Sequence, residues 1–424
     1  MSDPDTKSDP HVSPEQLCIG LYIHLDLSWT EHPFTFSSFK IKSLEQIATI
    51  RSLGLRQIRY SPDKSDGPPL APPPKQQVTS PSLQTPPPRE SDPVFQAKRE
   101  RMARLAQQRA KAAACEKALV SAAHTVKSIN QNVFARPDEV RTSAQALVDD
   151  MAASMLVDAD VSIQLMADKI GGEDLYHHGL NVSLLSMMLA KELKQDASTV
   201  KAVGLSALFH DIGELEIPAR LVKNVGSLNK AEFALWQQHV EYGVQIGKKL
   251  GLPAEVLQAI AQHHERVDGT GFPAHVKAAH MPLMSRILAL VNAYDDLCNH
   301  PDPLHALTPH EALSTLFAQQ RSQFDPLCLS TFVRCMGVYP PGTLVVLSNG
   351  ATGMVVSVNT TKPLRPTVLI HDPAVPREDA ILVDLEQEAE VSVTKTLRPQ
   401  QLSAEAHRYL APRKRITYYF DSEA

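Results

Sequence analysis

Apolar residues recur at helical spacing over most of residues 138–336, and this pattern constrains the fold more than any other feature. The segments LNVSLLSMMLAKEL, VKAVGLSALFH, AEFALWQQHVEYGVQIGKKL and MSRILALVNAYDDL place apolar side chains near the helical period. Two capping boxes, Asn229 with Glu232 and Thr308 with Glu311, mark helix starts. Because no strand-like segment separates these helices, the pattern predicts a helical bundle, in which polar sites form between facing helices.

Proline separates this region from a small N-terminal unit. Eleven of the 32 prolines lie in residues 61–93. Because proline fixes φ and removes a backbone donor, this stretch predicts an extended linker. Residues 14–60 contain a strand-like IGLYIHLDL and a helical SLEQIATIRSLGL, which predict a small α+β module. Residues 94–137 are rich in helix formers and predict a connecting helix, which either packs one stripe on the next domain or pairs in a homodimer.

The character of the chain changes after the helices. TLVVLSNGATGMVVSVN and RPTVLIHD are short β-branched runs, and the Asn-Gly pair in the first is a hairpin signal. Residues 337–424 are therefore predicted to form a β-rich extension that ends in a polar tail. The predicted fold is mainly α: a helical-bundle domain with a small N-terminal α+β module and a small C-terminal β-rich appendage.

Composition limits the class of protein. The 424 residues suffice for two or three domains, and 43% of them are apolar. A net charge of −5 and a pI of about 6.4 argue against a surface for nucleic-acid polymers or membranes. We find no secretory segment and no uninterrupted apolar run long enough for a membrane span. The five cysteines lack CxxC spacing and predict reduced, mostly buried thiols in a cytoplasmic protein.

Polar residues gather at the ends of the predicted helices: His178, His210–Asp211, His239 late in the helix that follows Asn229, His263–His264, and Asn292. One histidine at a helix end is usually structural. Several buried imidazoles together are costly unless they have a shared partner. Neutral imidazoles bind transition metals, and Asp211 could bridge two ions that activate a water and hold a phosphodiester. The pattern favours a metal phosphohydrolase over a packed polar core.

These residues resemble the HD-GYP family of metal-dependent phosphodiesterases, which open cyclic di-GMP to linear pGpG or GMP in bacteria. The histidines and Asp211 match the family's metal ligands in order and spacing between residues 178 and 337. HHERVDGTGFP looks like the family's signature loop, with Phe272 in place of its tyrosine. IGLYIHLDLSWTEHPFTFSSFKI resembles an N-terminal domain of unknown function attached to such domains, and GVYPPGTLVVLSNG recurs after them. The resemblance implies an HD-type fold, cyclic di-GMP as partner and a place in second-messenger signalling, with further protein partners.

The resemblance also implies two divalent metal ions, with iron or manganese as the family's metals. The first ion would be held by His178, His210, Asp211 and Asn292, and the second by Asp211, His239, His263 and His264. His210 and Asp211 are the implied catalytic residues. Some members bind a third ion through a glutamate one helical turn before the first histidine; Asp174 occupies that position here, and we expect it not to bind.

Three departures from the family bear on activity. Phe272 lacks the hydroxyl of the family's tyrosine but keeps an aromatic face, so we expect its effect to be small. Asn292 replaces an aspartate and offers only a neutral oxygen. Asp296, one helical turn on, could partly substitute, but we expect Asp295 and Asp296 to be surface carboxylates. Glu214 stands where the family has a phosphate-facing lysine. At about 6 Å and an effective dielectric of about 20, one charge is worth roughly 3 kcal/mol, and a reversal about twice that.

Glu214 has alternative roles, as a metal ligand or as an ion-pair partner of Arg266 or Arg286. The candidate substrate-binding residues are Glu214, the loop residues and a nearby arginine: Arg266, Asp268, Gly269, Gly271, Phe272, Pro273 and Arg286. The two glycines of the loop predict a close approach of its backbone to a ligand. Three functions remain open: an active cyclic di-GMP phosphodiesterase, a degenerate domain that binds cyclic di-GMP or proteins without turnover, and an unrelated phosphohydrolase.

Overall fold

The computed structural model describes residues 10–72 and 117–420, together with residues 103, 107 and 110; within the longer ranges residues 28–31, 33, 35–36, 158–162, 166–174, 301–304, 360–361, 374, 376, 378–379, 389 and 411–417 are excepted. The chain divides into two compact units, residues 1–106 with 372–381, and residues 107–371 with 382–424. Most of the predicted proline linker and the first part of the predicted connecting helix lie outside the described residues.

The N-terminal unit is a small α+β module, as predicted. Its elements are β1 (His11–Val12), η1 (Pro14–Gln16), β2 (Tyr22–His24), β3 (Ser38–Lys40), α1 (Leu44–Ser52), β4 (Ile58–Tyr60) and η2 (Pro62–Lys64). The strands form an antiparallel sheet in the order β1-β4-β2-β3. Ser43 caps α1 by accepting a hydrogen bond from the backbone of Gln46. Ile23, Ile41 and Ile50 are fully buried between sheet and helix.

The second unit is dominated by helices. Residues 117–132 are helical, and the elements that follow are α3 (Pro137–Val157), α4 (Leu175–Glu192), α5 (Ala197–Phe209), η3 (Ile212–Glu216), α6 (Ala219–Lys223), η4 (Val225–Ser227), α7 (Lys230–Trp236), α8 (His239–Lys249), α9 (Ala254–Gln262), η5 (Ala278–His280), α10 (Leu283–Cys298), α11 (Pro309–Ala318), η6 (Arg321–Gln323) and α12 (Pro326–Met336). Both predicted capping boxes are present, at the starts of α7 and α11.

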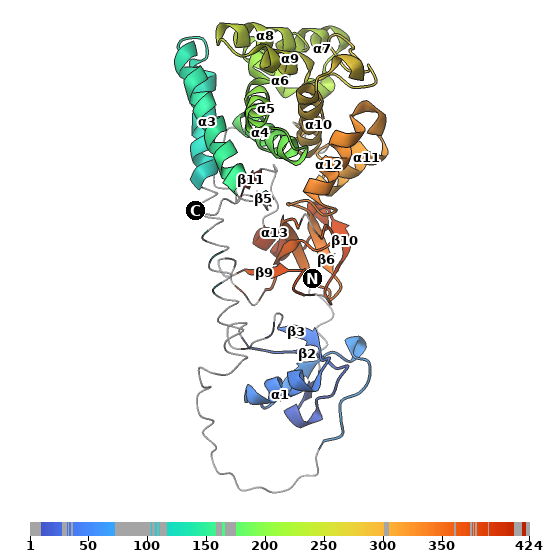
Figure 1. The fold of residues 1–424 in the computed structure, drawn as a ribbon. Helices are drawn as coiled ribbons and strands as arrows, with labels where there is room; N and C mark the ends of the chain where they lie inside the picture. The colour runs from blue at the N-terminus through green and yellow to red at the C-terminus, as the bar shows by residue number, and fades with distance from the viewer. Residues whose placement is uncertain are drawn as a thin grey trace. The chain divides into compact units, whose positions relative to one another are not determined.

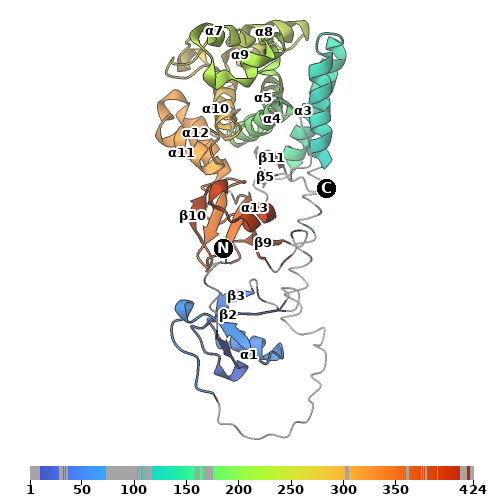
Figure 2. The ribbon, with the colours of Figure 1, turned by 180° about the vertical axis from the view of Figure 1, so that it is seen from behind.

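Helices α4 and α5 form the centre of this helical part (Figures 1 and 2). Residues 180–190 of α4 and residues 203–209 of α5 are buried, and α3, α9, α10 and α12 pack around the two helices. Asp196 caps the start of α5 through the backbone N–H of Thr199. Phe209 and Tyr294 are fully buried in the shared core. Because α4, α5, α8, α9 and α10 share one core, their polar ends are held in fixed relative positions.

Two predictions for the helical region are wrong in detail. The segment predicted as one helix after Asn229 is broken at Gln237–Gln238, so His239 begins α8 instead of lying late in a longer helix. The region also contains a strand, β5 (Ile163–Leu165), which pairs with β11 (Tyr418–Phe420) and touches β7 (Thr352–Ser357). Helical periodicity cannot reveal β5, because its partners are far away in the sequence.

The C-terminal part contains the predicted hairpin, β6 (Leu344–Leu347) with β7, closed by a turn in which Gly350 has a φ of +84°. The remaining elements are β8 (Thr367–Ile370), β9 (Ile381–Asp384), β10 (Val393–Leu397), η8 (Pro399–Gln401) and α13 (Ala404–Leu410). The sheet runs in the order β10-β6-β7-β5-β11, with β8 paired to β7 and β9. The predicted polar tail therefore includes a helix, α13, whose Leu410 is buried against Leu344 and Met354.

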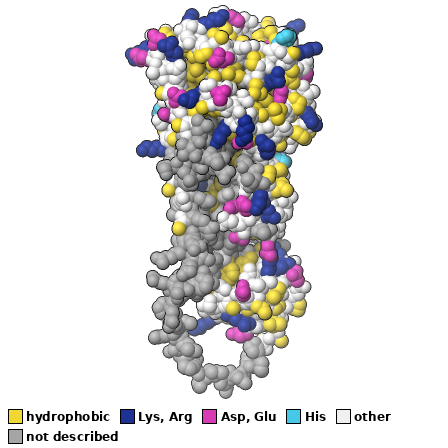
Figure 3. Space-filling model, in the orientation of Figure 1, with side chains coloured by type: hydrophobic (Ala, Val, Ile, Leu, Met, Phe, Trp, Pro, Cys, Tyr) yellow, Lys and Arg dark blue, Asp and Glu magenta, His cyan; other side chains and the backbone are white. Residues whose placement is uncertain are grey.

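Other predictions concern the surface and the cysteines. None of the described helices is both long and apolar enough to cross a membrane. On the face drawn in Figure 3, side chains of both charge signs are interspersed over the helical part. Four cysteines are free thiols, and three of them, Cys298, Cys328 and Cys335, are buried. Cys115 lies outside the described residues, as does Asp174, the candidate for a third metal site.

Candidate metal centre

The candidate ligands come from helix ends that face one another. His178 lies in the first turn of α4, the His210–Asp211 pair follows α5, and His239 is the first residue of α8. The His263–His264 pair follows α9, and Asn292 lies in the middle of α10. Gly213 in η3 lets this arrangement close, because a Cβ atom there would overlap the backbone carbonyl oxygen of His239.

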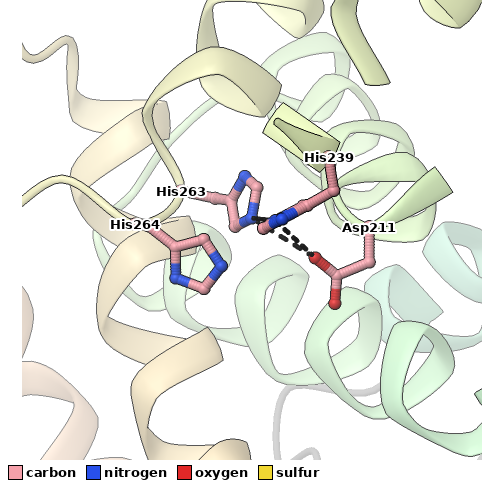
Figure 4. Close-up of side chains that lie close together, drawn as sticks. All are labelled: Asp211, His239, His263 and His264. Carbon is pink, nitrogen blue, oxygen red and sulfur yellow. Dashed lines mark hydrogen bonds and ion pairs between the residues drawn. The ribbon is translucent and has the colours of Figure 1, made fainter. Parts of the chain in front are cut away.

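One group of ligands consists of the residues expected to hold the second ion: Asp211, His239, His263 and His264. We call it the second cluster, and its ligand atoms all lie within 4.8 Å of one another. Figure 4 shows the rings of His239 and His263 directed at the Asp211 carboxylate, with His264 beside them. Oδ1 of Asp211 lies 3.3 Å from Nε2 of His263 and 3.6 Å from Nε2 of His239. The Nε2 atoms of these two histidines are 3.2 Å apart. Both rings are fully buried.

The backbone fixes the tautomer of these rings. Nδ1 of His239 donates to the carbonyl of Trp236 at 2.7 Å, and Nδ1 of His263 donates to the carbonyl of Ile260 at 2.7 Å. Each neutral ring carries one proton, so its Nε2 presents a lone pair. Two lone pairs that face each other at hydrogen-bond distance repel unless a cation lies between them. The second cluster is therefore built to receive a cation.

The residues expected to hold the first ion lie at the other oxygen of Asp211, and we call them the first-ion cluster. Oδ2 of Asp211 is 3.4 Å from Nε2 of His178 and 3.2 Å from Nε2 of His210. Oδ1 of Asn292 lies 3.0 and 3.1 Å from the same two nitrogens. Nδ1 of His210 donates to the carbonyl of Ala207 at 2.6 Å, so its Nε2 also faces inward as a lone pair.

Asp295 is buried, which contradicts the prediction that it lies on the surface. Its side chain is fully buried, and its Oδ2 accepts a hydrogen bond from Nδ1 of His178 at 2.7 Å. Its Oδ1 accepts from the side chains of Asn181 and Asn299, each at 3.0 Å. A carboxylate behind a ligating histidine fixes the ring and makes its free nitrogen more basic. Asp295 therefore positions His178 for the first-ion cluster.

Asp296 is exposed, as predicted, with 53% of its side-chain surface accessible. Its Oδ1 lies 4.0 Å from Nε2 of His178, and its Oδ2 lies 3.4 Å from Nδ2 of Asn292. It is therefore oriented toward the first-ion cluster from the open side. Partial desolvation, together with the negative charges of Asp211 and Asp295, raises the pKa of Asp296 to about 6.

The protonation states suit metal ligands. Burial lowers the pKa of His239, lowers that of His263 to about 4 and lowers that of His264 well below its usual range. These rings are neutral at neutral pH, as ligands must be. Burial opposes ionisation of Asp211, but the adjacent His210 imidazole and the hydrogen bond donated by His178 lower its pKa well below the usual range.

In the first-ion cluster a proton takes the position of a cation. Burial opposes a charge on His178, yet its hydrogen bonds to Asp211 and Asp295 raise its pKa well above the usual range. An ion bound there would displace that proton. Two buried atoms, Oδ1 of Asp211 and Nε2 of His264, have no hydrogen-bond partner. Inward lone pairs, a carboxylate shared by both clusters and unpartnered buried atoms all fit divalent metal ions of the class that binds imidazole and carboxylate.

Residues 147–327 match the sequence model of the HD domain. Residues 11–142 match a domain of unknown function, DUF3391, and residues 344–405 match a KOW domain associated with HD domains. The second unit carries an HD domain. The resemblance inferred from the histidine spacing is thereby confirmed, and the helical bundle around the clusters is the HD fold.

Several proteins are similar to part of this chain. A cyclic di-GMP phosphodiesterase of Pseudomonas aeruginosa is 31% identical over 228 residues, which are 54% of this chain and 55% of that protein. A 3'3'-cGAMP-specific phosphodiesterase of Vibrio cholerae is 27% identical over 163 residues, 38% of this chain and 35% of that protein. The chain thus spans about half or less of these relatives. A solved HDG"Y"P protein from Bdellovibrio bacteriovorus is 16% identical, with a TM-score of 0.41, and the alignment covers 76% of this chain and 97% of that one.

Glu214 in the HD domain pairs with neither arginine. Its Oε1 accepts a hydrogen bond from Nε1 of Trp236 at 3.0 Å, and the Trp236 ring lies between it and His239. Burial and the negative charge of Asp211 raise the pKa of Glu214 to about 8. A carboxyl with that pKa is mostly protonated at pH 7, so the full charge reversal expected from the sequence does not arise in the metal-free domain.

The signature loop is held by a residue that the sequence reasoning missed. Glu265 is fully buried, and its two oxygens accept hydrogen bonds from the backbone N–H groups of Ala274, at 2.6 Å, and Val276, at 3.1 Å. Gly271 is also structural, because a Cβ there would overlap the backbone of residues 264–266. Gly271 thus lies close to the backbone of the protein's own chain. The available signal for Glu265 in the sequence was an acid directly after two ligand histidines.

The other predicted substrate residues fall into two groups. Phe272 stacks on His264 with ring centroids 4.5 Å apart and also contacts Trp236, so it lies beside the second cluster. Asp268 organises the turn instead, since its Oδ1 accepts hydrogen bonds from the backbone and hydroxyl of Thr270. Gly269, with a φ of +85°, belongs to the same turn, and Pro273 is exposed.

The two arginines differ in position. Arg286 holds the segment before α10, because it donates to the carbonyls of Met281 and Ala278 and pairs with Asp325 at 2.9 Å. It is therefore not brought to the metal centre. Arg266 stacks over Phe324 at 4.9 Å, and the charge of Asp296 stabilises its positive form although burial lowers its pKa. Arg266 is the arginine that remains close to the ligands.

Proposed function

We propose that this protein is a metal-dependent phosphodiesterase that hydrolyses cyclic di-GMP to linear pGpG or GMP. The observation that carries the proposal is the double use of Asp211. One carboxylate oxygen faces the inward nitrogens of His239 and His263, and the other faces those of His178 and His210. A bridging carboxylate between two imidazole clusters is the arrangement that two-ion phosphodiester hydrolysis requires. The similar proteins named as cyclic dinucleotide phosphodiesterases support the same chemistry.

The chain's own residues have separable roles in this proposal. Bound ions of iron or manganese would activate a water and stabilise the charge that develops on the phosphate. The carbonyls of Ala207, Trp236 and Ile260 keep the imidazoles in the tautomer that presents Nε2, so the site needs little reorganisation when it is loaded.

The surroundings provide features for a nucleotide. The partly exposed ring of Phe272, packed against the buried Trp236 beside the second cluster, suits a purine base. Arg266 is a positive charge close to the ligands that suits a phosphate. Glu214, when protonated, adds no negative charge against an anionic substrate. These features favour turnover over a binding role without hydrolysis.

The test is product analysis under reducing conditions with added iron or manganese. Purified protein is incubated with cyclic di-GMP or with 3'3'-cGAMP, and the products are separated by chromatography. We expect linear pGpG or GMP from cyclic di-GMP, and faster turnover of cyclic di-GMP than of 3'3'-cGAMP. Asp211→Asn should abolish turnover, whereas Asp138→Asn, the same change at an exposed carboxylate of α3, should retain it. Calorimetric binding of cyclic di-GMP by the metal-loaded protein without any product would contradict the proposal.

A further inference from the structure

The first-ion cluster is poor in negative charge. It contains two imidazoles, the amide oxygen of Asn292 and one oxygen of Asp211, whose other oxygen faces the second cluster. An amide oxygen is a neutral ligand, and divalent ions are bound more tightly as the number of charged ligands rises. Both clusters share this one carboxylate, but the first-ion cluster has a neutral amide oxygen where the second cluster has a third imidazole. The first-ion cluster is therefore the weaker of the two, unless another acid contributes.

Helix α10 places two acids near the cluster, and they are used differently. Asp295 is fully buried, and its carboxylate accepts hydrogen bonds from Nδ1 of His178 and from the side chains of Asn181 and Asn299. It cannot reach the inward Nε2 without breaking those bonds. Asp296 lies four residues after Asn292, so both side chains are on the same face of α10.

The contacts of Asp296 point into the cluster. Its Oδ1 is 4.0 Å from the inward Nε2 of His178, and its Oδ2 is 3.4 Å from the amide nitrogen of Asn292. Among the described side chains, His178 is its only ion-pair partner within 4.0 Å. An ordinary surface carboxylate would extend into solvent or pair with a lysine or arginine. Here the carboxylate lies over the open side of the site, with half of its surface accessible.

We propose that Asp296 is the carboxylate ligand of the first ion, which restores the negative charge that Asn292 cannot supply. The inference rests on the proposed function only in requiring that the two clusters bind ions. Asn292 then contributes its amide oxygen from one turn earlier on α10, and its Nδ2 steadies the Asp296 carboxylate by donating to it. The negative charge of the first site is thus supplied one helical turn after position 292, by Asp296.

The test measures metal binding without turnover. Mn²⁺ is titrated into metal-free protein, and free Mn²⁺ is followed by electron paramagnetic resonance, which resolves the number of sites and their affinities. We expect two sites in the unmodified protein, and in Asp296→Asn a loss of at least about tenfold in affinity at one site with the other unchanged. Asn292→Asp in the Asp296→Asn background moves the carboxylate back by one turn and should restore the lost site. Asp138→Asn is the control for the chemical change.

The outcomes separate the two proposals. Two unchanged sites in Asp296→Asn would overturn the role of Asp296, as would a single site in the unmodified protein or a weakened site that the second substitution fails to restore. Two Mn²⁺ sites with the expected response to substitution, but no hydrolysis of cyclic di-GMP, would support this inference and contradict the proposed function. Circular dichroism of each variant shows whether the helices remain folded, and restoration by the second substitution excludes a folding defect as the cause.

Discussion

Replacing Glu214 with glutamine should remove a pH-dependent loss of stability from the HD domain. The Glu214 carboxyl accepts a hydrogen bond from Trp236, and burial together with the charge of Asp211 raises its pKa from 4.5 to about 8. Glutamine keeps an oxygen that can accept the hydrogen bond from Trp236 but has no titrating proton. The substitution therefore isolates the ionisation of Glu214 from its contact.

The size of the effect follows from the two pKa values. In the unfolded chain Glu214 is ionised above its usual pKa of 4.5, whereas in the folded domain it keeps its proton up to about pH 8. Unfolding then releases a proton, so the free energy of unfolding falls as pH rises, by about 1.36 kcal/mol per pH unit. From about pH 5.5 to about pH 7.5 the loss is about 2.5 kcal/mol. Bound divalent ions attract the ionised form, so the effect belongs to the metal-free protein.

The chain offers a specific probe of this change. Trp29 and Trp236 are its only tryptophans, so in a Trp29→Phe background the fluorescence reports unfolding around Trp236. Urea titrations with a chelator, repeated across this pH range, give the free energy of unfolding for the parent and for Glu214→Gln. Glu216→Gln, at an exposed position of the same 3-10 helix, is the matched control.

We expect the stability difference between Glu214→Gln and the parent to increase by about 2.5 kcal/mol across the range. The difference for Glu216→Gln should stay within about 0.5 kcal/mol. A difference that is constant with pH for Glu214→Gln would show that the carboxyl is already ionised in the folded domain at the lower pH. That result would refute the argument that burial keeps Glu214 protonated.

Three further substitutions test the supports of the site. Asp295→Asn should weaken Mn²⁺ binding at the first-ion cluster by about 10- to 100-fold, because His178 loses the carboxylate that orients it; unchanged binding would contradict this role. Gly213→Ala should lower the free energy of unfolding by about 1–3 kcal/mol or more, measured by thermal unfolding, since its Cβ overlaps a backbone oxygen. Glu265→Gln places an amide donor against a backbone N–H, so the opening free energy at Ala274 and Val276 should fall by about 1–3 kcal/mol, measured as faster hydrogen exchange. Protection equal to that of the unmodified protein would contradict the role of Glu265.

The sequence allowed the ligand set to be predicted because ligand chemistry restricts residue type, and helical spacing restricts position. His178, the His210–Asp211 pair and the His263–His264 pair could be placed at helix ends without knowing how the helices pack. The break between α7 and α8 was not predictable in the same way, because the apolar pattern continues through Gln237–Gln238. The break places His239 at a helix start, where its Nδ1 reaches the carbonyl of Trp236.

The helical periodicity of the sequence could not predict which acidic side chains are buried. Asp295 and Asp296 are adjacent on α10, and the helical period separates them by about 100° but does not say which one a neighbouring helix covers. Asn181 and His178 of α4 cover Asp295, and that packing decides its role. Glu265 and Glu214 present the same problem, since each is an acid whose function depends on groups that lie far away in the sequence.

The departures from the family at positions 292 and 214 have to be considered together. An aspartate at position 292 and a lysine at position 214 would carry opposite charges that sum to zero. Asn292 is neutral, and Glu214 with a pKa of about 8 is mostly neutral at pH 7, so the sum at these two positions is again near zero. Taken one at a time, each substitution predicts a large electrostatic loss at the metal centre. Taken as a pair in a buried environment, they largely preserve its net charge, and the carboxylate of Asp296 adds the negative charge that faces the first ion.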